Sequence, residues 1–424
     1  AHQSKIWDGD LFGGVYFLNS VGFSAHKTTI DAVSSFPAQE STTRRLADPT
    51  ALSFSGPSPV TLNISGDAVI NASAQGGAGV MFNSRNWDAA KTTINLRNGN
   101  VIWTASTGDA ILTDGKSVAA FTFANTYYNN TVYVNLEQAN LAVIADASGA
   151  VRDKVPGFAS AIVLNSPWVA NGFIFSGAGN VSVTGKSSLA DGINARVITN
   201  KDLNGTFSLQ GESDSGVGVT LDGPLDAHLI NASISGMSHS GIGVNISALK
   251  GKADLGNNEI TGVSDTSAGI QIIGSNVTVT NGALTGRSGG AGAGVSLKGG
   301  SQYTFSGVNV TGQSVDGAGV SVSGNLAVND QTTLNGTASG AGDGISVTGS
   351  LQSVGGVTLN GTAVDGNGVA VSGNTSLNNA TVSGDSTSGS GVSIAGQLTA
   401  DGNTVLNGTS HSGAGMELGD AHVT

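Results

Sequence analysis

The chain has 424 residues, including 65 glycines, 7 prolines and no cysteine. Charged residues make up only 11%, which argues against intrinsic disorder, and the net charge of −12 argues against a nucleic-acid partner. No run of about 18 apolar residues is present, so we expect no transmembrane helix. The absence of cysteine fits a chain that is exported unfolded, because stray disulfides would be a hazard on that route.

Short alternating apolar segments occupy the N-terminal half at irregular spacing. The first expected strand lies at residues 14–18. Four later segments end in a valine or isoleucine that follows a glycine or an alanine, at residues 77–80, 108–111, 159–162 and 190–193. We interpret them as strands of irregular coils that are lengthened by loop insertions at residues 83–91, 125–130 and 147–156.

The N-terminal half also holds most of the aromatic and basic residues. All four tryptophans lie within the first 168 residues. Trp103, Phe121 and Phe123 alternate with polar residues and are expected in the core. Insertions in solenoids often form a binding face, where exposed aromatic and basic side chains anchor partners or stack on sugar rings. The predicted receptor- or glycan-binding residues are Arg85, Trp87, Tyr127, Tyr128, Arg152 and Lys154.

From about residue 205 to 419 the sequence repeats itself nine times, and two columns of glycine recur every 23 to 26 residues. The first column precedes an apolar pair and consists of Gly218, Gly243, Gly269, Gly294, Gly319, Gly344, Gly368, Gly391 and Gly415. The second column consists of Gly211, Gly236, Gly262, Gly286, Gly312, Gly336, Gly361, Gly384 and Gly408. A period of this length indicates a solenoid.

The residues of one repeat indicate which solenoid it is. After the first glycine, β-branched residues alternate with small polar ones, as in residues 320–322 and 345–347. A second strand is expected to end at the other glycine, for example at residues 333–336, and a third near residues 326–328. Glycine, asparagine, aspartate and serine suit the corners between them, because they adopt left-handed conformations or bond their own backbone.

These patterns predict an all-β protein that forms a right-handed parallel β-helix. We expect about 24–25 residues per coil in the C-terminal half, and irregular coils in the N-terminal half. A β-sandwich array is the alternative, but it needs longer units of antiparallel hairpins. Residues 1–200 would form the receptor-binding region and residues 201–424 a regular stalk. Because no lysine or arginine follows Lys298, this stalk is expected to be acidic.

Motifs for catalysis, phosphate binding and metal binding are not found. His239 and His411 share one repeat position before Ser-Gly, which the repeat explains better than a metal does. We therefore expect no cofactor, no metal site and no enzymatic activity. The alternative is a polysaccharide-degrading β-helix, either a glycosidase or a lyase, which would need two carboxylates about 5–9 Å apart in a groove.

Fourteen Asn-x-Ser/Thr tripeptides are present, as expected of a chain so rich in these residues. Asn335, Asn360 and Asn407 share one repeat position in Asn-Gly-Thr, which we place at a corner. Glycosylation there is a weak prediction.

The segments at residues 334–349 and 386–396 resemble the repeats of filamentous-haemagglutinin-like two-partner-secreted exoproteins of Gram-negative bacteria. That family includes adhesins and contact-dependent growth inhibition effectors. The resemblance covers roughly residues 205–419 and implies an extracellular β-helix, exported through an outer-membrane transporter and involved in cell adhesion and virulence. The Asn-Pro-Asn signature of the family's secretion domain is not found, so we expect an internal segment of a longer protein or, alternatively, an autotransporter passenger.

Three functions remain open on these grounds. The first is a monomeric binding segment that recognises a cell-surface receptor or glycan on a host or target cell. The second is a polysaccharide-degrading enzyme such as a tailspike. The third is a pure spacer, in which the insertions bind nothing.

Overall fold

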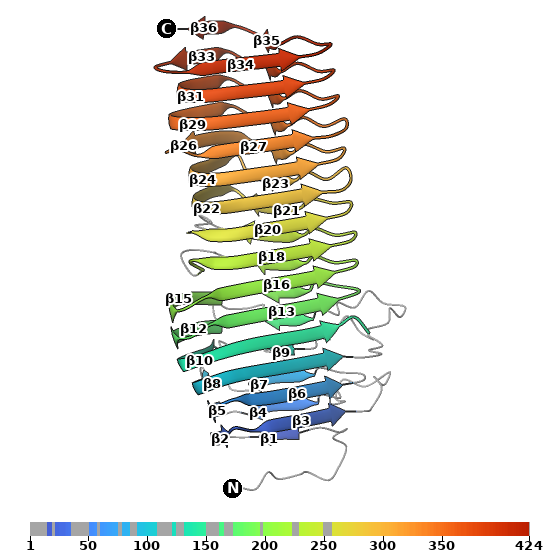
Figure 1. Cartoon of the computed structure of the whole chain (residues 1–424), viewed down its shortest axis with the longest axis vertical. Coiled ribbons are helices and arrows are strands. Elements are labelled where there is room, and N and C mark those ends of the chain that lie inside the picture. The colour runs from blue at the N-terminus through green and yellow to red at the C-terminus, as the bar shows by residue number, and fades with distance from the viewer. Residues whose placement is uncertain are drawn as a thin grey trace. The chain divides into compact units, whose positions relative to one another are not determined.

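The computed structural model of the chain describes residues 15–18, 22–34, 51–56, 60–74, 79–84, 91–107, 121–123, 131–149, 161–164, 173–195, 198–222, 229–248 and 257–423. In this described part the regular structure is β-strand throughout (Figure 1). No helix in it could span a membrane. The chain divides into two compact units, residues 1–220 and residues 221–424.

Each coil of the solenoid has three faces, which we name A, B and C in the order in which the chain passes through them. In unit 1, face A consists of β1 (Val15–Leu18), β4 (Leu52–Gly56), β7 (Val80–Ser84), β9 (Phe121–Phe123), β11 (Ile162–Leu164) and β14 (Ile193–Ala195). In unit 2, it consists of β19 (Val244–Ala248), β21 (Ile270–Gly274), β23 (Val295–Lys298), β25 (Val320–Val322), β28 (Ile345–Val347), β30 (Val369–Val371), β32 (Val392–Ile394) and β35 (Met416–Leu418). The strand β17 (Val219–Asp222) contains the division between the units.

Faces B and C follow face A, and several long strands run through both of them. In unit 1 these strands are β2 (Gly22–His26), β3 (Thr29–Ser34), β5 (Val60–Ser65), β6 (Ala68–Ala74), β8 (Lys91–Thr107), β10 (Thr131–Ala147), β12 (Phe173–Ala178), β13 (Val181–Ser187), β15 (Ile198–Asn204) and β16 (Phe207–Ser213). In unit 2 they are β18 (Ala232–Ser238), β20 (Asn258–Ser264), β22 (Asn276–Ser288), β24 (Gln302–Ser314), β26 (Asn325–Asn329), β27 (Thr333–Ala338), β29 (Leu351–Ala363), β31 (Thr375–Ser386), β33 (Leu398–Asp401), β34 (Val405–Ser410) and β36 (Ala421–Val423).

The corner between faces B and C is made by one or two residues in the left-handed conformation. It bends the 17-residue strand β8 at Asn98, where φ is 53°, and β22 at Asn281, where φ is 47°. In other coils of unit 2 the same bend carries Gly307, Asp330, Gly355, Asn379 or Gly402. These residue types tolerate a positive φ, as the sequence predicted for corners, but Lys27, Gln138 and Gln331 adopt a positive φ at the same corner in other coils.

Adjacent coils pair in parallel, and the register shows their length. Asn135 bonds Asn95, which lies 40 residues earlier in unit 1, whereas Asn360 bonds Asn335, only 25 residues earlier in unit 2. In Figure 1 the strands nearest the viewer point to the right while the colour advances upwards, so each unit coils in the right-handed sense. The prediction of a right-handed parallel β-helix is confirmed.

The core is built from ladders of alternate side chains. On face A of unit 2, Val295, Val320 and Ile345 are completely buried, each in register with its neighbour one coil away. Unit 1 is filled by larger side chains, and Trp103 is buried as expected. Phe175 packs against Phe207 with ring centroids 5.2 Å apart. An apolar void of about 20 Å³ remains beside Trp103.

The two glycine columns mark the place where faces C and A converge inside the coil. A Cβ atom on any glycine of the second column would lie between 1.8 and 2.1 Å from the carbonyl oxygen of the glycine that precedes face A. Real Cβ atoms do not approach other atoms this closely, so no other residue fits. None of these column glycines has a positive φ. Close backbone approach therefore explains the columns, and turn conformation does not.

In unit 1 the second-column position changes from glycine to alanine. The register aligns Gly211 and Gly185 with Ala145, Ala105 and Ala72 in successive coils. The position before face A varies, with the fully buried Ala161 one coil before Gly192 but a glycine before β7. The irregular spacing of the N-terminal half concealed this change.

One expectation about strand positions needs correction. The second strand of the repeat does not end at its glycine, because β27 continues through Gly336 to Ala338. The expected strand at 108–111 lies outside the described residues. The described face A strand between β7 and β11 is β9, whose Phe121 pairs with both Val80 and Ile162.

Candidate functional site

The six residues predicted to bind a receptor or glycan, Arg85, Trp87, Tyr127, Tyr128, Arg152 and Lys154, lie outside the described residues. Their segments connect β7 to β8, β9 to β10 and β10 to β11. The binding role assigned to these residues therefore stays a prediction.

A hollow of about 270 Å³ lies on the outer side of face C in unit 1. We call it the face C hollow and define it by its lining residues, Asn71, Ala72, Ser73, Thr104, Ala105, Ser106, Ile144 and Asp146. They come from β6, β8 and β10, three strands that are adjacent in the sheet. Ala72 and Ala105 point into the core, so the outward side chains of the other six residues give the hollow its chemistry.

The register explains why the surface is hollow here. In one outward column, Ser73 pairs with Ser106, and Ser106 pairs in turn with Asp146. On the far side, Ser73 pairs with Val33, which is 68% exposed. The short side chains of Ser73 and Ser106 thus lie between the longer ones of Val33 and Asp146. The surface is lower at the two serines because their side chains fill less volume.

The second outward column forms another wall of the hollow. Asn71 pairs with Thr104, and Thr104 pairs with Ile144, whose side chain is 44% exposed. Asn71 donates to a carboxylate oxygen of Asp31 over 2.7 Å, and Thr104 donates to the Asn71 carbonyl. These bonds hold the amide and the hydroxyl in fixed positions.

Asp146 is the carboxylate of the hollow. Its Oδ1 atom accepts hydrogen bonds from the backbone N–H and the hydroxyl of Ser148, at 2.8 and 2.6 Å. Its Oδ2 atom accepts no hydrogen bond from the described residues. Ser106 donates to the Ser73 hydroxyl over 3.0 Å, which leaves the Ser73 proton available to a ligand. The hollow therefore offers one open carboxylate oxygen and several hydroxyl groups.

The outward column that contains Ser73, Ser106 and Asp146 continues in the next two coils with Lys186 and Glu212, which form an ion pair. Lys186 pairs in register with Asp146, and its ammonium group lies 3.0 Å from the Glu212 carboxylate. The hydrogen bond and the charge of Glu212 raise the pKa of Lys186 above its usual value. The charge of Asp146 adds to this rise in the pKa of Lys186, although Lys186 itself is not among the described residues that line the hollow.

Face B of unit 1 carries a ladder of amides. Asn95 donates to Asn63 and Asn135 donates to Asn95, both over 2.8 Å, and Ser176 continues the row by donating to Asn135. The partners are half-buried and satisfy one another, so this ladder holds coils together and offers little to a ligand.

The predicted glycosylation column lies on face C of unit 2. Asn335, Asn360 and Asn407 are within β27, β29 and β34, so they occupy strand positions instead of corners. Asn360 donates to the Asn335 carbonyl over 3.0 Å. Glycosylation at these residues stays a prediction.

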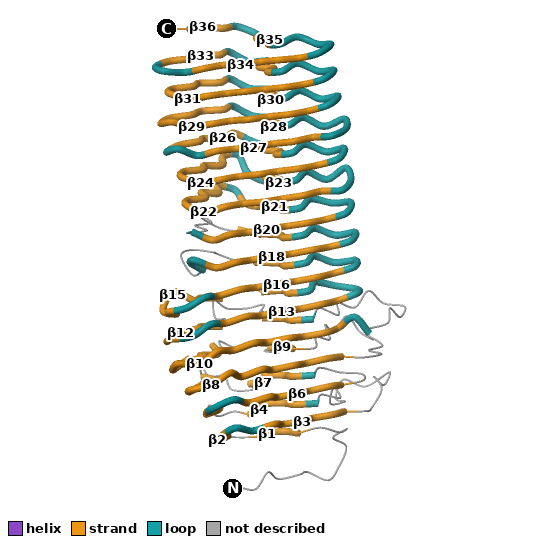
Figure 2. Tube along the Cα trace, in the orientation of Figure 1, coloured by secondary structure: helices purple, strands orange, loops and turns teal. Residues whose placement is uncertain are grey.

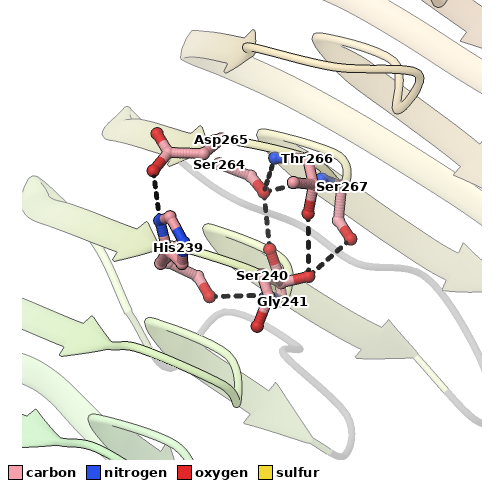
Figure 3. A network of polar contacts seen from close by, with 8 residues as sticks. His239, Ser240, Gly241, Ser264, Asp265, Thr266 and Ser267 are labelled. Carbon is pink, nitrogen blue, oxygen red and sulfur yellow. Dashed lines mark hydrogen bonds and ion pairs between the residues drawn. The ribbon is translucent and has the colours of Figure 1, made fainter.

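Loops form the corner from face C to face A in unit 2 (Figure 2), and a polar network links two successive corners (Figure 3). Ser264 is buried, donates to the Gly241 carbonyl of the previous coil over 2.6 Å, and accepts from the Ser267 N–H over 2.8 Å. Buried serines occupy the same place in other coils, at Ser213, Ser238, Ser288, Ser314 and Ser386. Each closes its own corner or ties it to the previous coil, which is a structural role.

His239 lies at the edge of this network. Its Nδ1 atom is 2.6 Å from Oδ2 of Asp265, and both side chains are mostly exposed to solvent. An exposed pair of this kind adds little to stability. No group of three or more potential metal ligands of the His, Cys, Asp or Glu types gathers anywhere in the described part of the chain.

No protein-family model, curated protein or solved structure matches this chain. The face C hollow is therefore interpreted from its geometry. The sequence reading missed it, because Ser73, Ser106 and Asp146 are 33 and 40 residues apart and become neighbours only once each coil length is known.

Proposed function

We propose that this chain is an extracellular binding segment of a large bacterial surface exoprotein, in which unit 1 recognises a receptor or glycan on another cell. Unit 2 would act as an acidic stalk. The observation that carries the proposal is the face C hollow, which is lined in part by the exposed Ile144 and is adjoined by Val33, the exposed register partner of Ser73. Concave sites with an apolar part are where ligands bind.

The cellular setting of the proposal comes from the repeat style. The Gly-rich units of residues 205–419 resemble those of two-partner-secreted exoproteins, which suggests export through an outer-membrane transporter to the surface of a Gram-negative bacterium. An adhesin and a contact-dependent growth inhibition effector both use such a binding segment. The absence of cysteine and the low charge fit either one.

The test is binding of the purified full chain to intact epithelial and Gram-negative cells, measured by flow cytometry. Val33→Ser removes an exposed side chain beside the hollow and should weaken binding several-fold. Met237→Ser is the matched control, because Met237 is 49% exposed at the equivalent strand position of β18 in unit 2. Binding to no cell type would favour the spacer hypothesis, and equal loss in both variants would show that binding does not depend on the face C hollow.

A polysaccharide-degrading enzyme is the second candidate. Asp146 is the one carboxylate among the described residues that line the hollow, whereas glycoside hydrolysis ordinarily uses two. Release of reducing sugar from capsular and plant polysaccharides, assayed in parallel, decides between the two. Release that is abolished by Asp146→Asn would replace the binding proposal with the enzymatic one.

A further inference from the structure

We infer that the face C hollow is a subsite for one ring of an uncharged saccharide. This inference rests on the proposed binding function and names the class of its ligand. It is drawn from the size of the hollow, its polar groups, its aliphatic wall and its charge.

The size of the hollow limits what it can hold. Pockets for drug-sized ligands usually enclose about 300–1,000 Å³. The face C hollow, at about 270 Å³, lies just below that range, so it fits a single ring-sized group. It opens on the outer surface of a sheet, so a polymer could leave it on either side.

The polar groups of the hollow match a polyhydroxyl ligand. The Ser73 hydroxyl can donate to a ligand, while the oxygens of Thr104 and Ser106, whose protons go to Asn71 and Ser73, and Oδ2 of Asp146 can accept. They belong to strands and to an amide–hydroxyl chain that is already ordered, so binding would immobilise few side chains. Preorganised donors and acceptors reduce the entropy cost of binding.

The wall of the hollow supplies the apolar part of the site. Ile144 is 44% exposed beside Asp146, and its register partners in the two adjacent strands, Thr104 and Thr184, are polar. A sugar ring carries hydroxyls at its rim and C–H groups on its faces. Burying a C–H face against Ile144, with hydroxyls toward Asp146 and Ser73, satisfies both kinds of surface at once.

The negative charge of the hollow favours neutral saccharides over acidic ones. The described lining contains a carboxylate and no basic group, and the chain carries a net charge of −12. A sialic acid, a uronate or a sulfate ester placed beside Asp146 would meet like charge. The geometry thus selects a neutral hexose or N-acetylhexosamine residue.

A peptide ligand fits this site less well. Extended peptides usually bind a sheet by pairing with an unpaired strand edge. The backbone groups of β6, β8 and β10 are paired with one another in parallel ladders, so this face presents side chains and no free edge.

The experiment uses the full chain on an array of neutral, sialylated and sulfated oligosaccharides. Ser73→Phe fills the hollow from an outward, exposed position and should lower binding to neutral saccharides by at least about tenfold. Asp146→Asn keeps the acceptor for Ser148 but removes the charge, and should weaken binding about five- to tenfold. Thr362→Phe is the matched control, because Thr362 occupies the equivalent outward position of β29 in unit 2.

Each outcome bears on one proposal only. Selective loss in the two unit 1 variants, with Thr362→Phe unchanged, supports a neutral saccharide subsite. Binding restricted to sialylated or sulfated saccharides, or full binding by Ser73→Phe, overturns it. If the chain binds cells but no saccharide, and protease treatment of the cells abolishes binding, the ligand is a protein receptor and the binding function survives without the subsite.

Discussion

The coils of units 1 and 2 have the same three faces but differ in the residues of their core and in their length. In unit 2 the convergence of faces C and A is closed by pairs of glycine, the core is mostly aliphatic, and coils repeat every 23 to 26 residues. In the first coils of unit 1 alanine takes the second-column position, aromatic rings fill the core, and equivalent residues lie 28 to 41 positions apart. The comparison teaches that the same parallel pairing accommodates different coil lengths when the residues of the core and of the convergence change with them.

The outer surfaces of face C also differ between the two units. Some neighbouring coils of unit 2 repeat small polar residues on the outside of face C, as Thr333, Asn335 and Thr337 do one coil before Thr358, Asn360 and Thr362. Earlier coils of unit 2 vary more, with Met237, Arg287 and Gln313 in the column of Thr337. In unit 1 serine, aspartate, isoleucine and valine alternate from coil to coil and leave a hollow. A ladder of like residues is flat, whereas a ladder of unlike residues has relief to which a ligand can bind.

The largest expected effect concerns the convergence of the faces. Gly336→Ala places a Cβ about 2.0 Å from the Gly344 carbonyl, so we expect a loss of about 3 kcal/mol in the free energy of unfolding. Ala105→Gly in unit 1 removes only a methyl group and should cost about 1 kcal/mol. Urea unfolding followed by circular dichroism, with hydrogen exchange to localise the change, measures both. Equal losses would mean that close approach does not distinguish the units.

The amide ladder of unit 1 should matter more than its counterpart in unit 2. Asn95 bonds both Asn63 and Asn135 in a half-buried row, so Asn95→Ala should lower the free energy of unfolding by about 2 kcal/mol. Asn360→Ala removes one bond, to Asn335, at an exposed position and should cost about 0.5 kcal/mol. The same urea titrations test this, and a reversed order would contradict it.

The corner serines are expected to contribute less. Ser264→Ala leaves the Gly241 carbonyl and the Ser267 N–H without that partner, at a cost of about 1–2 kcal/mol. Alanine already occupies the position in two coils of unit 2, at Ala338 and Ala363. Ala338→Ser is the control and should be neutral or stabilising. Faster hydrogen exchange at residues 265–269 in Ser264→Ala alone would localise the effect to that corner.

The smallest effect should appear at high pH in unit 2. Burial raises the pKa of Tyr303 above its usual value near 10, and a hydrogen bond from the Gly300 N–H opposes this shift only in part. Because the folded pKa is raised, its contribution to stability is complete below about pH 10 and falls as pH rises through the folded value. Unfolding should therefore become easier above pH 10 in the parent chain.

Tyr303→Phe is the variant that isolates this titration. It should lose some stability at neutral pH, because the Gly300 N–H loses its acceptor, but the further loss above pH 10 should shrink. Urea midpoints between pH 8 and pH 11 test it. An identical alkaline slope in both proteins would mean that another group controls the slope.

Much of the fold follows from the sequence of unit 2. Two glycine columns and the alternation around residues 320 and 345 predicted the solenoid, its coil length and its face A strands, which the structure places at β25 and β28. The physical reason for the two glycine columns could not be read from the sequence. A glycine that is needed to avoid a steric clash and a glycine that is needed for a turn look the same there. Unit 1 was harder, since the register between Ala72, Ala105 and Ala145 cannot be read when coil lengths change.

The sequence alone therefore determined the class of fold and the contrast between a varied and a repetitive half, because local periodicity directly encodes which side chains face inward. Only the tertiary structure decided which residues become neighbours on the outside. Ser73, Ser106 and Asp146 form one surface column because loops of unequal length return the chain to the same register in parallel pairing. The energy that fixes this register lies in backbone ladders and buried rows, and outward residues at the candidate site follow it without contributing a signal of their own.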